Sequence, residues 1–211
     1  MKKYIYVVLI ICFIFGSIIF ADDNDFRSVK WGMSKKEVAT AENQKEFNAG
    51  GSYKSPANML IYENQKVGDY DCRLEYTFHD DKLIKVKYIF ITHAKIELWD
   101  TAASMAKKDW AFSFDAYGKL KDLLTIKYGG PQEDNQKWAN ESWKGVGGSI
   151  PFHIAEGHLI LNAKWDLGKT NICLNCDGNN SFAGHYLTSI YYYEAEYYKS
   201  LLPKEPEKKD L

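Results

Sequence analysis

Apolar and polar residues alternate along two neighbouring segments, CRLEYTFH at positions 72–79 and KLIKVKYIF at positions 82–90. Alternation with a period of two is typical of a strand that buries one face. The apolar positions that share a face are Cys72, Leu74, Tyr76 and Phe78 in the first segment and Ile84, Val86, Tyr88 and Phe90 in the second. Because HDDK between them favours a tight turn, the pattern predicts an antiparallel hairpin with one buried face and one face in water.

Apolar residues at helical spacing predict helices in three places. The first helix covers about residues 35–46. Residues 95–112 form a helical connector, which leads into a stronger helix over about 114–128. Gly129 favours a left-handed cap at the end of this helix, and Pro131 prevents the helix from resuming.

Strand patterns follow each of the two main helices. They cover residues 59–63, 70–79 and 83–92 after the first helix, and 136–144, 150–154, 158–166, 170–176 and 186–194 after the second. The repeated order predicts an α+β fold of two tandem helix-plus-antiparallel-sheet modules, at residues 22–94 and 113–196. Residues 197–211 end in PKEPEKKDL, which has little apolar content, and we expect a flexible tail there.

The N-terminus has the pattern of a secretory signal peptide. Lys2 and Lys3 precede an uncharged, largely apolar stretch over residues 4–20, and Ala21 is followed at once by acidic residues. We therefore expect residues 1–21 to be a signal peptide cleaved after Ala21, and the mature protein to be periplasmic or extracellular. A retained membrane anchor is the alternative, because a stretch of 17 residues lies at the lower edge of the roughly 17 to 25 that span a bilayer. Only a retained anchor would bring the protein to the membrane.

The charge and the cysteine content of the chain bear on its partners and on its disulfide bonds. The chain has 27 basic and 28 acidic residues, and loss of two lysines with the signal peptide leaves a net charge of −3. This balance does not favour a nucleic acid as partner. Three cysteines, Cys72, Cys173 and Cys176, remain after cleavage, an odd number that allows at most one internal disulfide. A bridge between Cys72 and Cys176, which both lie on predicted core faces, is one candidate.

The segment VKWGMSKKEV at residues 29–38 carries the signals of a helix start. The motif consists of Trp31, Gly32, Met33, Ser34, Glu37 and Val38. The serine and the glutamate have the spacing of a capping box, and the methionine and the valine are placed for a hydrophobic staple. The glycine permits a sharp turn into the helix, and the tryptophan can cover the helix end. These residues predict a structural motif rather than a reactive site.

This helix start, DFRSVKWGMSKKEV, together with LEYTFHDDKL and LKDLLTIKYGGP, resembles a group of uncharacterised bacterial secreted proteins and lipoproteins over most of residues 25–194. The Gly-Met-Ser-x-x-x-Val motif alone is similar to that of small outer-membrane assembly lipoproteins of the SmpA/OmlA type and of the modules of β-lactamase inhibitor proteins. The resemblance implies a helix-plus-antiparallel-sheet module that binds other proteins and catalyses nothing.

The sequence CLNC, from Cys173 to Cys176, points to thiol or metal chemistry. Such pairs occur in thiol oxidoreductases, where a helix N-terminus activates the thiolate, and in metal sites. The flanking alternation instead predicts a strand, which places the two thiols on opposite faces about 10 Å apart. Because a disulfide needs Cα atoms within about 7 Å of each other, this chemistry would require a bulge in the strand.

Three other patterns match chemical motifs only in part. AKWDLGKT at 163–170 fits a relaxed phosphate-loop pattern, but its alternation predicts two strands and a turn instead of a loop that opens a helix. His153 and His158 flank a predicted turn with Glu156, yet no further metal ligand is evident there. Ordinary turn chemistry accounts for His79, Asp80 and Asp81. We therefore expect no catalytic residue, metal or cofactor.

Tyr191 and Tyr193 share the outward face of the last predicted strand. They can form a binding surface or pack against neighbouring elements. We predict a non-enzymatic secreted or periplasmic protein that binds another envelope or extracellular protein. The alternatives are glycan or cell-wall binding through exposed aromatic side chains, and thiol or metal chemistry at CLNC.

Overall fold

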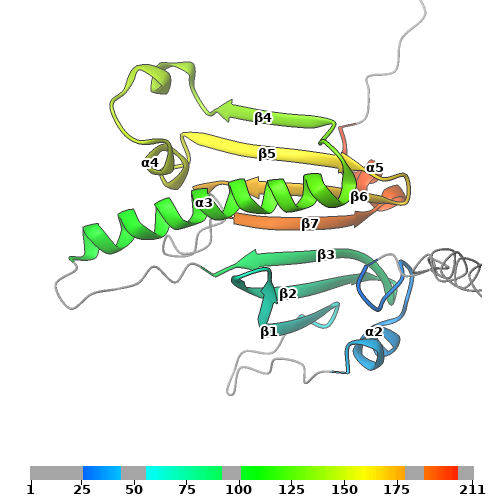
Figure 1. The fold of residues 1–211 in the computed structure, drawn as a ribbon. Helices are drawn as coiled ribbons and strands as arrows, with labels where there is room; N and C mark the ends of the chain where they lie inside the picture. The colour runs from blue at the N-terminus through cyan, green and yellow to red at the C-terminus, as the bar shows by residue number, and fades with distance from the viewer. Residues whose placement is uncertain (1–25, 44–55, 92–100, 179–187, 204–211) are drawn as a thin grey trace, which may run out of the picture.

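The computed structural model describes residues 26–43, 56–91, 101–178 and 188–203. Its centre is one antiparallel sheet of seven strands in the order β1-β2-β3-β7-β6-β5-β4 (Figure 1). The strands are β1 (Met59–Val67), β2 (Tyr70–His79), β3 (Lys82–Phe90), β4 (Glu133–Trp138), β5 (Leu159–Asp166), β6 (Thr170–Cys176) and β7 (Thr188–Glu194). Together with the helices described next, this sheet confirms the predicted α+β class.

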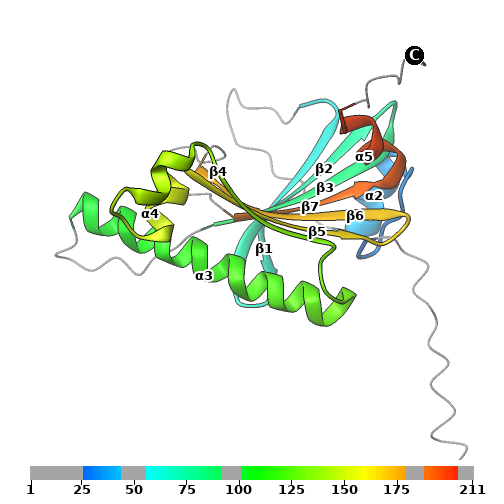
Figure 2. The ribbon, with the colours of Figure 1, turned by 90° about the horizontal axis from the view of Figure 1, so that it is seen from above.

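The two faces of the sheet carry different helices. The long helix α3 (Ala102–Tyr128) crosses one face, which we call the inner face, and α5 (Ala195–Leu201) lies on the other, the outer face (Figures 1 and 2). Three short helical segments complete the described fold: α2 (Lys35–Glu42), the 3₁₀ segment η1 (Glu141–Gly145) and α4 (Ile150–Ala155). α4 contacts α3 through the rings of Trp110 and Phe152, whose centroids are 6.0 Å apart.

The two predicted modules are not confirmed, because their strands belong to one sheet. β7, from the second predicted module, pairs with β3 of the first, with Val86 opposite Tyr192. The predicted connector and the helix after it are also continuous, since α3 runs without a break from Ala102 to Tyr128. No proline interrupts this stretch of sequence, so the helix has no reason to stop between them. Residues 95–100 of the connector lie outside the described residues.

Two strands predicted after α3 are wrong in part. Residues 150–154 form the helix α4, because Ser149 caps its N-terminus and Pro151 lies in its first turn, where a missing N–H costs nothing. The strand predicted over 136–144 is β4, which begins earlier and ends at Trp138, before η1. Asn140 accepts a hydrogen bond from the backbone of Ser142 and begins that 3₁₀ segment.

The ends of three helices also differ from expectation. α2 ends at Glu42, where Asn43 takes the left-handed conformation. Gly129 ends α3 with a φ of 84°, but its ψ of −178° is extended and not left-handed helical. Part of the predicted flexible tail belongs to α5, whose first backbone N–H groups donate to the carboxylate of Glu194. The tail beyond residue 203 lies outside the described residues.

The hairpin of β2 and β3 has the predicted alternation with one exception. All four apolar positions predicted on β2 are buried. On β3, Ile84 is only half-buried, and Leu83 faces the core instead. Lys85 pairs with Thr77 while Leu83 pairs with Phe78, so Ile84 is the extra residue of a β-bulge. The bulge shifts the inward face of β3 by one residue at that end of the strand.

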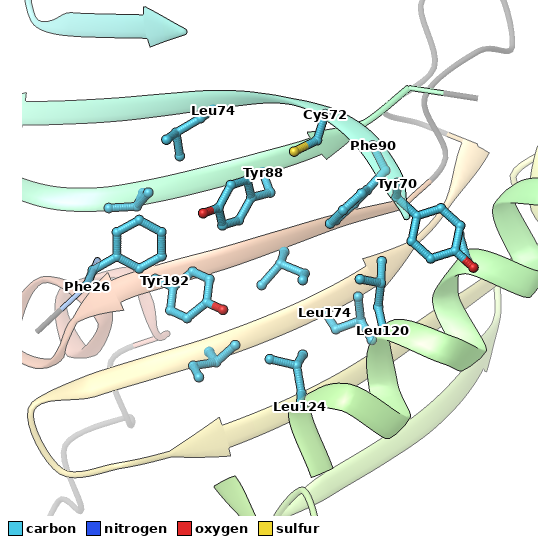
Figure 3. Close-up of a cluster of buried hydrophobic side chains, with 14 of the residues drawn as sticks. Phe26, Tyr70, Cys72, Leu74, Tyr88, Phe90, Leu120, Leu124, Leu174 and Tyr192 are labelled. Atoms are coloured by element: carbon cyan, nitrogen blue, oxygen red, sulfur yellow. The ribbon is translucent and has the colours of Figure 1, made fainter. Parts of the chain in front are cut away.

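The core lies between the inner face of the sheet and α3. In Figure 3, Leu120 and Leu124 project from α3 toward the sheet, while Tyr88 and Tyr192, on neighbouring strands, lie beside Phe26. All five side chains are at most 8% exposed. Because burial of apolar surface is the main favourable contribution to folding, this contact ties the N-terminal segment, the sheet and α3 into one unit.

Candidate functional site

The predicted helix start is a structural cap in the structure as well. The Ser34 side chain accepts a hydrogen bond from the Glu37 backbone N–H at 3.3 Å, and the Glu37 carboxylate accepts one from the Ser34 backbone at 2.8 Å. The backbone N–H and the hydroxyl of Ser34 both donate to the Glu37 carboxylate, and these hydrogen bonds lower the pKa of Glu37. The carboxylate of Asp81, in the turn between β2 and β3, also accepts from the backbone N–H of Lys35 at 3.0 Å. Two side chains therefore accept hydrogen bonds from backbone N–H groups in the first turn of α2, which have no partner within the helix.

The residues before this cap join the N-terminal segment to the sheet. The backbone N–H of Gly32, which has a φ of 82°, donates to Leu83 at 3.0 Å, and the Leu83 N–H donates back to Met33 at 2.9 Å. The indole N–H of Trp31, predicted to cover the helix end, donates to the Thr170 hydroxyl at 2.8 Å. Val38 is fully buried. The motif therefore fixes where α2 and the preceding residues lie.

A buried polar cluster joins the same segment to the inner face of the sheet. An Arg27 nitrogen lies 3.2 Å from a Glu42 carboxylate oxygen, and that glutamate side chain is only 2% exposed. The Tyr76 hydroxyl donates to Glu42. Burial raises the pKa of Tyr88, which also contacts Arg27, to about 12. The sequence placed Tyr76 and Tyr88 on one face of the predicted hairpin, but no sequence pattern places Arg27 and Glu42 against them.

A cleft lies beside this cluster, between α3 and the inner face of the sheet. Its volume is about 520 Å³. We call it the α3 cleft, and it is lined by Phe26, Arg27, Val67, Tyr88, Leu120, Leu123, Leu124, Lys127, Tyr128, Ile190 and Tyr192. Most of its wall is apolar, and the two cations in this set lie on different segments of the chain. The sequence did not predict this cleft.

The disulfide suggested between Cys72 and Cys176 is not present. Both are free, buried thiols, as is Cys173. Cys72 and Cys176 do share the inner face of the sheet, but β3 and β7 lie between their strands. Three strand spacings of about 4.8 Å separate them by about 14 Å, twice the Cα distance that a disulfide tolerates.

The CLNC pair does not form a dithiol site. β6 keeps a regular register from Thr170 to Cys176, so Cys173 and Cys176 point to opposite faces of the sheet. Cys173 lies against the Tyr198 hydroxyl, 3.9 Å away on the outer face. Burial raises the pKa of Cys173, and it raises the pKa of Cys176 to about 12. Neither thiol lies at a helix N-terminus, the position that activates a thiolate.

The structure does bring the two histidines together, on different elements from those predicted. His153 lies in α4 and His158 just before β5, with their Nδ1 atoms 3.4 Å apart. The His158 ring stacks on Trp143 at 3.7 Å between centroids. Glu156 is the C-cap of α4. Within the described ranges, no group of three or more His, Cys, Asp or Glu side chains could hold a metal ion.

The two remaining motifs are turns between antiparallel strands. Residues 163–170 run from β5 through a turn into β6, and the Gly168 N–H donates to Asp166 at 2.9 Å. A helix does not follow this turn, so the phosphate-loop geometry is absent there. The turn after His79 has positive φ at both Asp80 and Asp81, as a tight hairpin turn requires.

Tyr191 and Tyr193 are part of a larger group of tyrosines on the outer face. Their rings are parallel within 4°, with centroids 5.8 Å apart. The Tyr193 centroid also lies 6.3 Å from Tyr197 and 5.4 Å from Tyr198, both on α5. We call these four residues, all half-buried, the tyrosine surface. The sequence indicated two of the four, and it missed the other two because residues 197–211 were expected to be flexible.

Two lysines lie at the edge of the tyrosine surface, and one of them, Lys164, is paired with Glu133 at 2.9 Å. The Lys87 ammonium, on the adjacent strand β3, lies 5.0 Å from the Tyr191 ring centroid. At the other end, the Tyr198 hydroxyl interacts with Lys164 and with Cys173. Burial raises the pKa of Tyr193. The surface therefore combines large apolar ring area with hydroxyl and ammonium donors, a combination that suits recognition of a partner.

Two further observations concern membrane-spanning helices and similarity to known proteins. Across the part of the chain that the structure describes, no helix has both the length and the hydropathy needed to cross a membrane. Comparison of the chain with protein-family models, with curated proteins and with solved structures finds no match.

Proposed function

We propose that this chain is a non-enzymatic secreted or periplasmic protein that binds another envelope or extracellular protein through its tyrosine surface. The observation that carries the proposal is the continuous group of four half-buried tyrosine rings on the face opposite α3. Tyrosine offers large contact area at a small cost in side-chain entropy and is enriched at the centres of interfaces. The role implied by the resemblance to secreted binding modules agrees with this proposal.

A protein partner fits this surface better than a glycan. Sugar recognition by aromatic side chains uses ring faces that are free to stack on the sugar. Here the faces of Tyr191 and Tyr193 pack on each other, and the Lys87 ammonium also lies over Tyr191. The edges of the rings are left to contact a partner. This favours a protein surface, which can meet them with both apolar and polar groups.

Thiol chemistry at CLNC has less support. A thiol acts as a nucleophile or metal ligand only as its thiolate. Burial raises the pKa of both Cys173 and Cys176, and the two side chains point to opposite faces of β6. The raised pKa and the separation both disfavour a reaction that needs a reactive pair.

Secretion is the other half of the proposal and rests on the sequence of residues 1–21, which lie outside the described residues. We expect the protein recovered from the periplasm or culture medium to begin at Asp22, after cleavage at Ala21. Intact mass measurement of the purified protein tests this. A mass that retains the first 21 residues, in a membrane fraction, would show a retained anchor instead.

Site-specific photo-cross-linking in the producing cells tests the binding proposal. A benzophenone amino acid replaces Tyr191 in one variant and Ile126 in a matched control, because Ile126 is an 82% exposed apolar residue on α3. We expect one discrete protein adduct from position 191 and not from position 126. Equal adducts at both positions, or none, would contradict the proposal, and enrichment of the wild type on purified peptidoglycan would favour the glycan alternative.

A further inference from the structure

We propose that the α3 cleft is a binding site for a single-chain fatty carboxylate. This site lies on the inner face of the sheet, whereas the tyrosine surface lies on the outer face, so the inference goes beyond the proposed function. The cleft volume of about 520 Å³ is in the range of sites for small organic ligands, about 300 to 1,000 Å³.

The walls of the cleft suit an alkyl chain. Leu120, Leu123 and Leu124 line one side from α3, and Ile190 of β7 contributes to the sheet side. Val67, at the end of β1, also lines the cleft. Figure 3 shows Leu120 and Leu124 pointing from α3 toward the sheet. Burial of an alkyl chain against such side chains is favourable in proportion to the apolar area removed from water.

The polar groups of the cleft gather toward the C-terminal end of α3. Lys127 lies seven residues after Leu120, which corresponds to about 10 Å along the helix. The Tyr128 hydroxyl is hydrogen-bonded to Tyr192, and the Phe26 ring lies 4.7 Å from the Tyr192 ring. The Arg27 guanidinium, in contrast, reaches Glu42, and it donates a hydrogen bond to Gln65 of β1 at 3.3 Å. Lys127 therefore places a cation near the C-terminal end of α3 in a cleft whose lining is otherwise largely apolar.

The charged side chains that line the cleft leave one positive charge without a paired carboxylate, which suits a ligand with one negative charge. None of the lining residues is an aspartate or a glutamate. Arg27 is already paired with Glu42, so its charge is largely compensated. The Lys127 ammonium lies 4.9 Å from the Tyr128 ring centroid, and no ion pair joins it to a carboxylate among the described residues. One uncompensated cation remains at the polar end.

A carboxylate fits this single cation better than a phosphate. A phosphate monoester carries about 1.5 to 2 negative charges near neutral pH and needs several strong donors. A carboxylate carries one charge, which the single Lys127 ammonium, with its three N–H donors, can meet. The occupant that fits both ends is therefore an alkyl chain that ends in one carboxylate.

Isothermal titration calorimetry of the purified protein with decanoate, below its micelle concentration, tests the site. Decanol serves as the neutral probe of the same length, and decyl phosphate as the probe for a phosphate head. We expect decanoate to bind best, and Lys127→Gln to weaken decanoate about fivefold, the upper range for one exposed charge contact. Decanol binding should be unchanged by this substitution.

Lys119→Gln is the matched control, because Lys119 is an exposed lysine of the same helix that does not line the cleft. Lys127→Arg keeps the charge and should restore decanoate binding to within about twofold. Failure of wild-type protein to bind decanoate would overturn the proposal. So would equal loss in Lys119→Gln and Lys127→Gln, an unchanged affinity in Lys127→Gln, or tighter binding of decyl phosphate than of decanoate.

Discussion

At the scale of single residues, the N-terminal segment is held by hydrogen bonds and one buried ion pair. Ser34 satisfies a backbone N–H of α2 from within the helix start, and Asp81 satisfies another from the β2–β3 turn. Because Asp81 belongs to the sheet, this second cap also fixes where α2 lies. The buried pair of Arg27 and Glu42 joins the same segment to the inner face.

Ser34→Ala should lower the free energy of unfolding by about 1 kcal/mol, because an N–H at the helix start loses its acceptor. Ser34→Asp is the control, since its carboxylate can accept the same hydrogen bond and should keep most of the stability. Urea denaturation followed by circular dichroism measures both. If the alanine variant were as stable as the wild type, the cap would not contribute to the fold.

Arg27→Gln should lower the free energy of unfolding by about 2 kcal/mol. The substitution leaves the Glu42 carboxylate buried without its cation, which costs about 3 to 5 kcal/mol in a fully buried pair. We expect less because the Arg27 side chain is 33% exposed. A double-mutant cycle with Glu42→Gln measures the coupling. Additive effects of the two single substitutions would show that the ion pair contributes nothing of its own.

At the scale of elements, the hairpin of β2 and β3 and the start of α2 could be predicted from the sequence, because both depend on local patterns. The apolar run at residues 150–154 is too short for the spacing of its apolar residues to distinguish a strand from a helix. In the structure it is a helix, and Pro151 lies in its first turn. The pairing of β7 with β3 joins residues about 100 positions apart, which no local pattern encodes.

In the candidate sites, too, local sequence patterns indicated some residues, whereas contacts between distant segments could not be predicted. Tyr191 and Tyr193 could be selected from the alternation of their strand, but α5 had to form before Tyr197 and Tyr198 could join them. The α3 cleft could not be predicted at all, since its lining comes from five elements and segments that meet only in the folded chain.

The continuity of α3 predicts opposite effects for two glycine substitutions. Gly118 lies inside the helix, and an added Cβ would meet no atom within 4 Å. Gly118→Ala should therefore raise the free energy of unfolding by about 0.5 to 1 kcal/mol. Gly129, just after the helix, has a φ of 84°, so Gly129→Ala should lower it. Thermal unfolding measures both, and a destabilising Gly118→Ala would contradict an unbroken helix at this position.

At the scale of the whole molecule, one sheet unites residues that the sequence suggested would form two modules. The core extends along the inner face from β1 to β5 and includes both Cys72 and Cys176. We therefore expect the described fold to unfold in a single transition, with the same midpoint by far-ultraviolet circular dichroism and by tryptophan fluorescence. Two separate transitions would support two independent modules instead.

Stability should fall in alkaline solution because the core holds protonated thiols. Burial raises the pKa of Cys72 and of Cys176 from 9.0 to about 12. Between these values the unfolded chain loses the two protons while the folded chain keeps them, so the free energy of unfolding decreases as pH rises. The raised pKa of Tyr88, about 12, adds to the effect above its usual value of 10.0.

Urea denaturation at intervals from pH 8 to pH 12 measures this dependence. A Cys176→Ala variant should be less stable than the wild type at pH 8, but its stability should fall less steeply with pH, because one of the titrating groups is gone. A slope equal to that of the wild type would show that this thiol does not titrate as described.

The central claim is that the tyrosine surface binds a protein, and the affinity of a double substitution for the cross-linked partner tests it most directly. Tyr191→Ser with Tyr193→Ser should weaken binding at least about 30-fold, since residues at the centre of an interface contribute 2 kcal/mol or more. Ile126→Ser, on the other side of the molecule, should bind like the wild type. Unchanged affinity in a double variant that remains folded would contradict the claim.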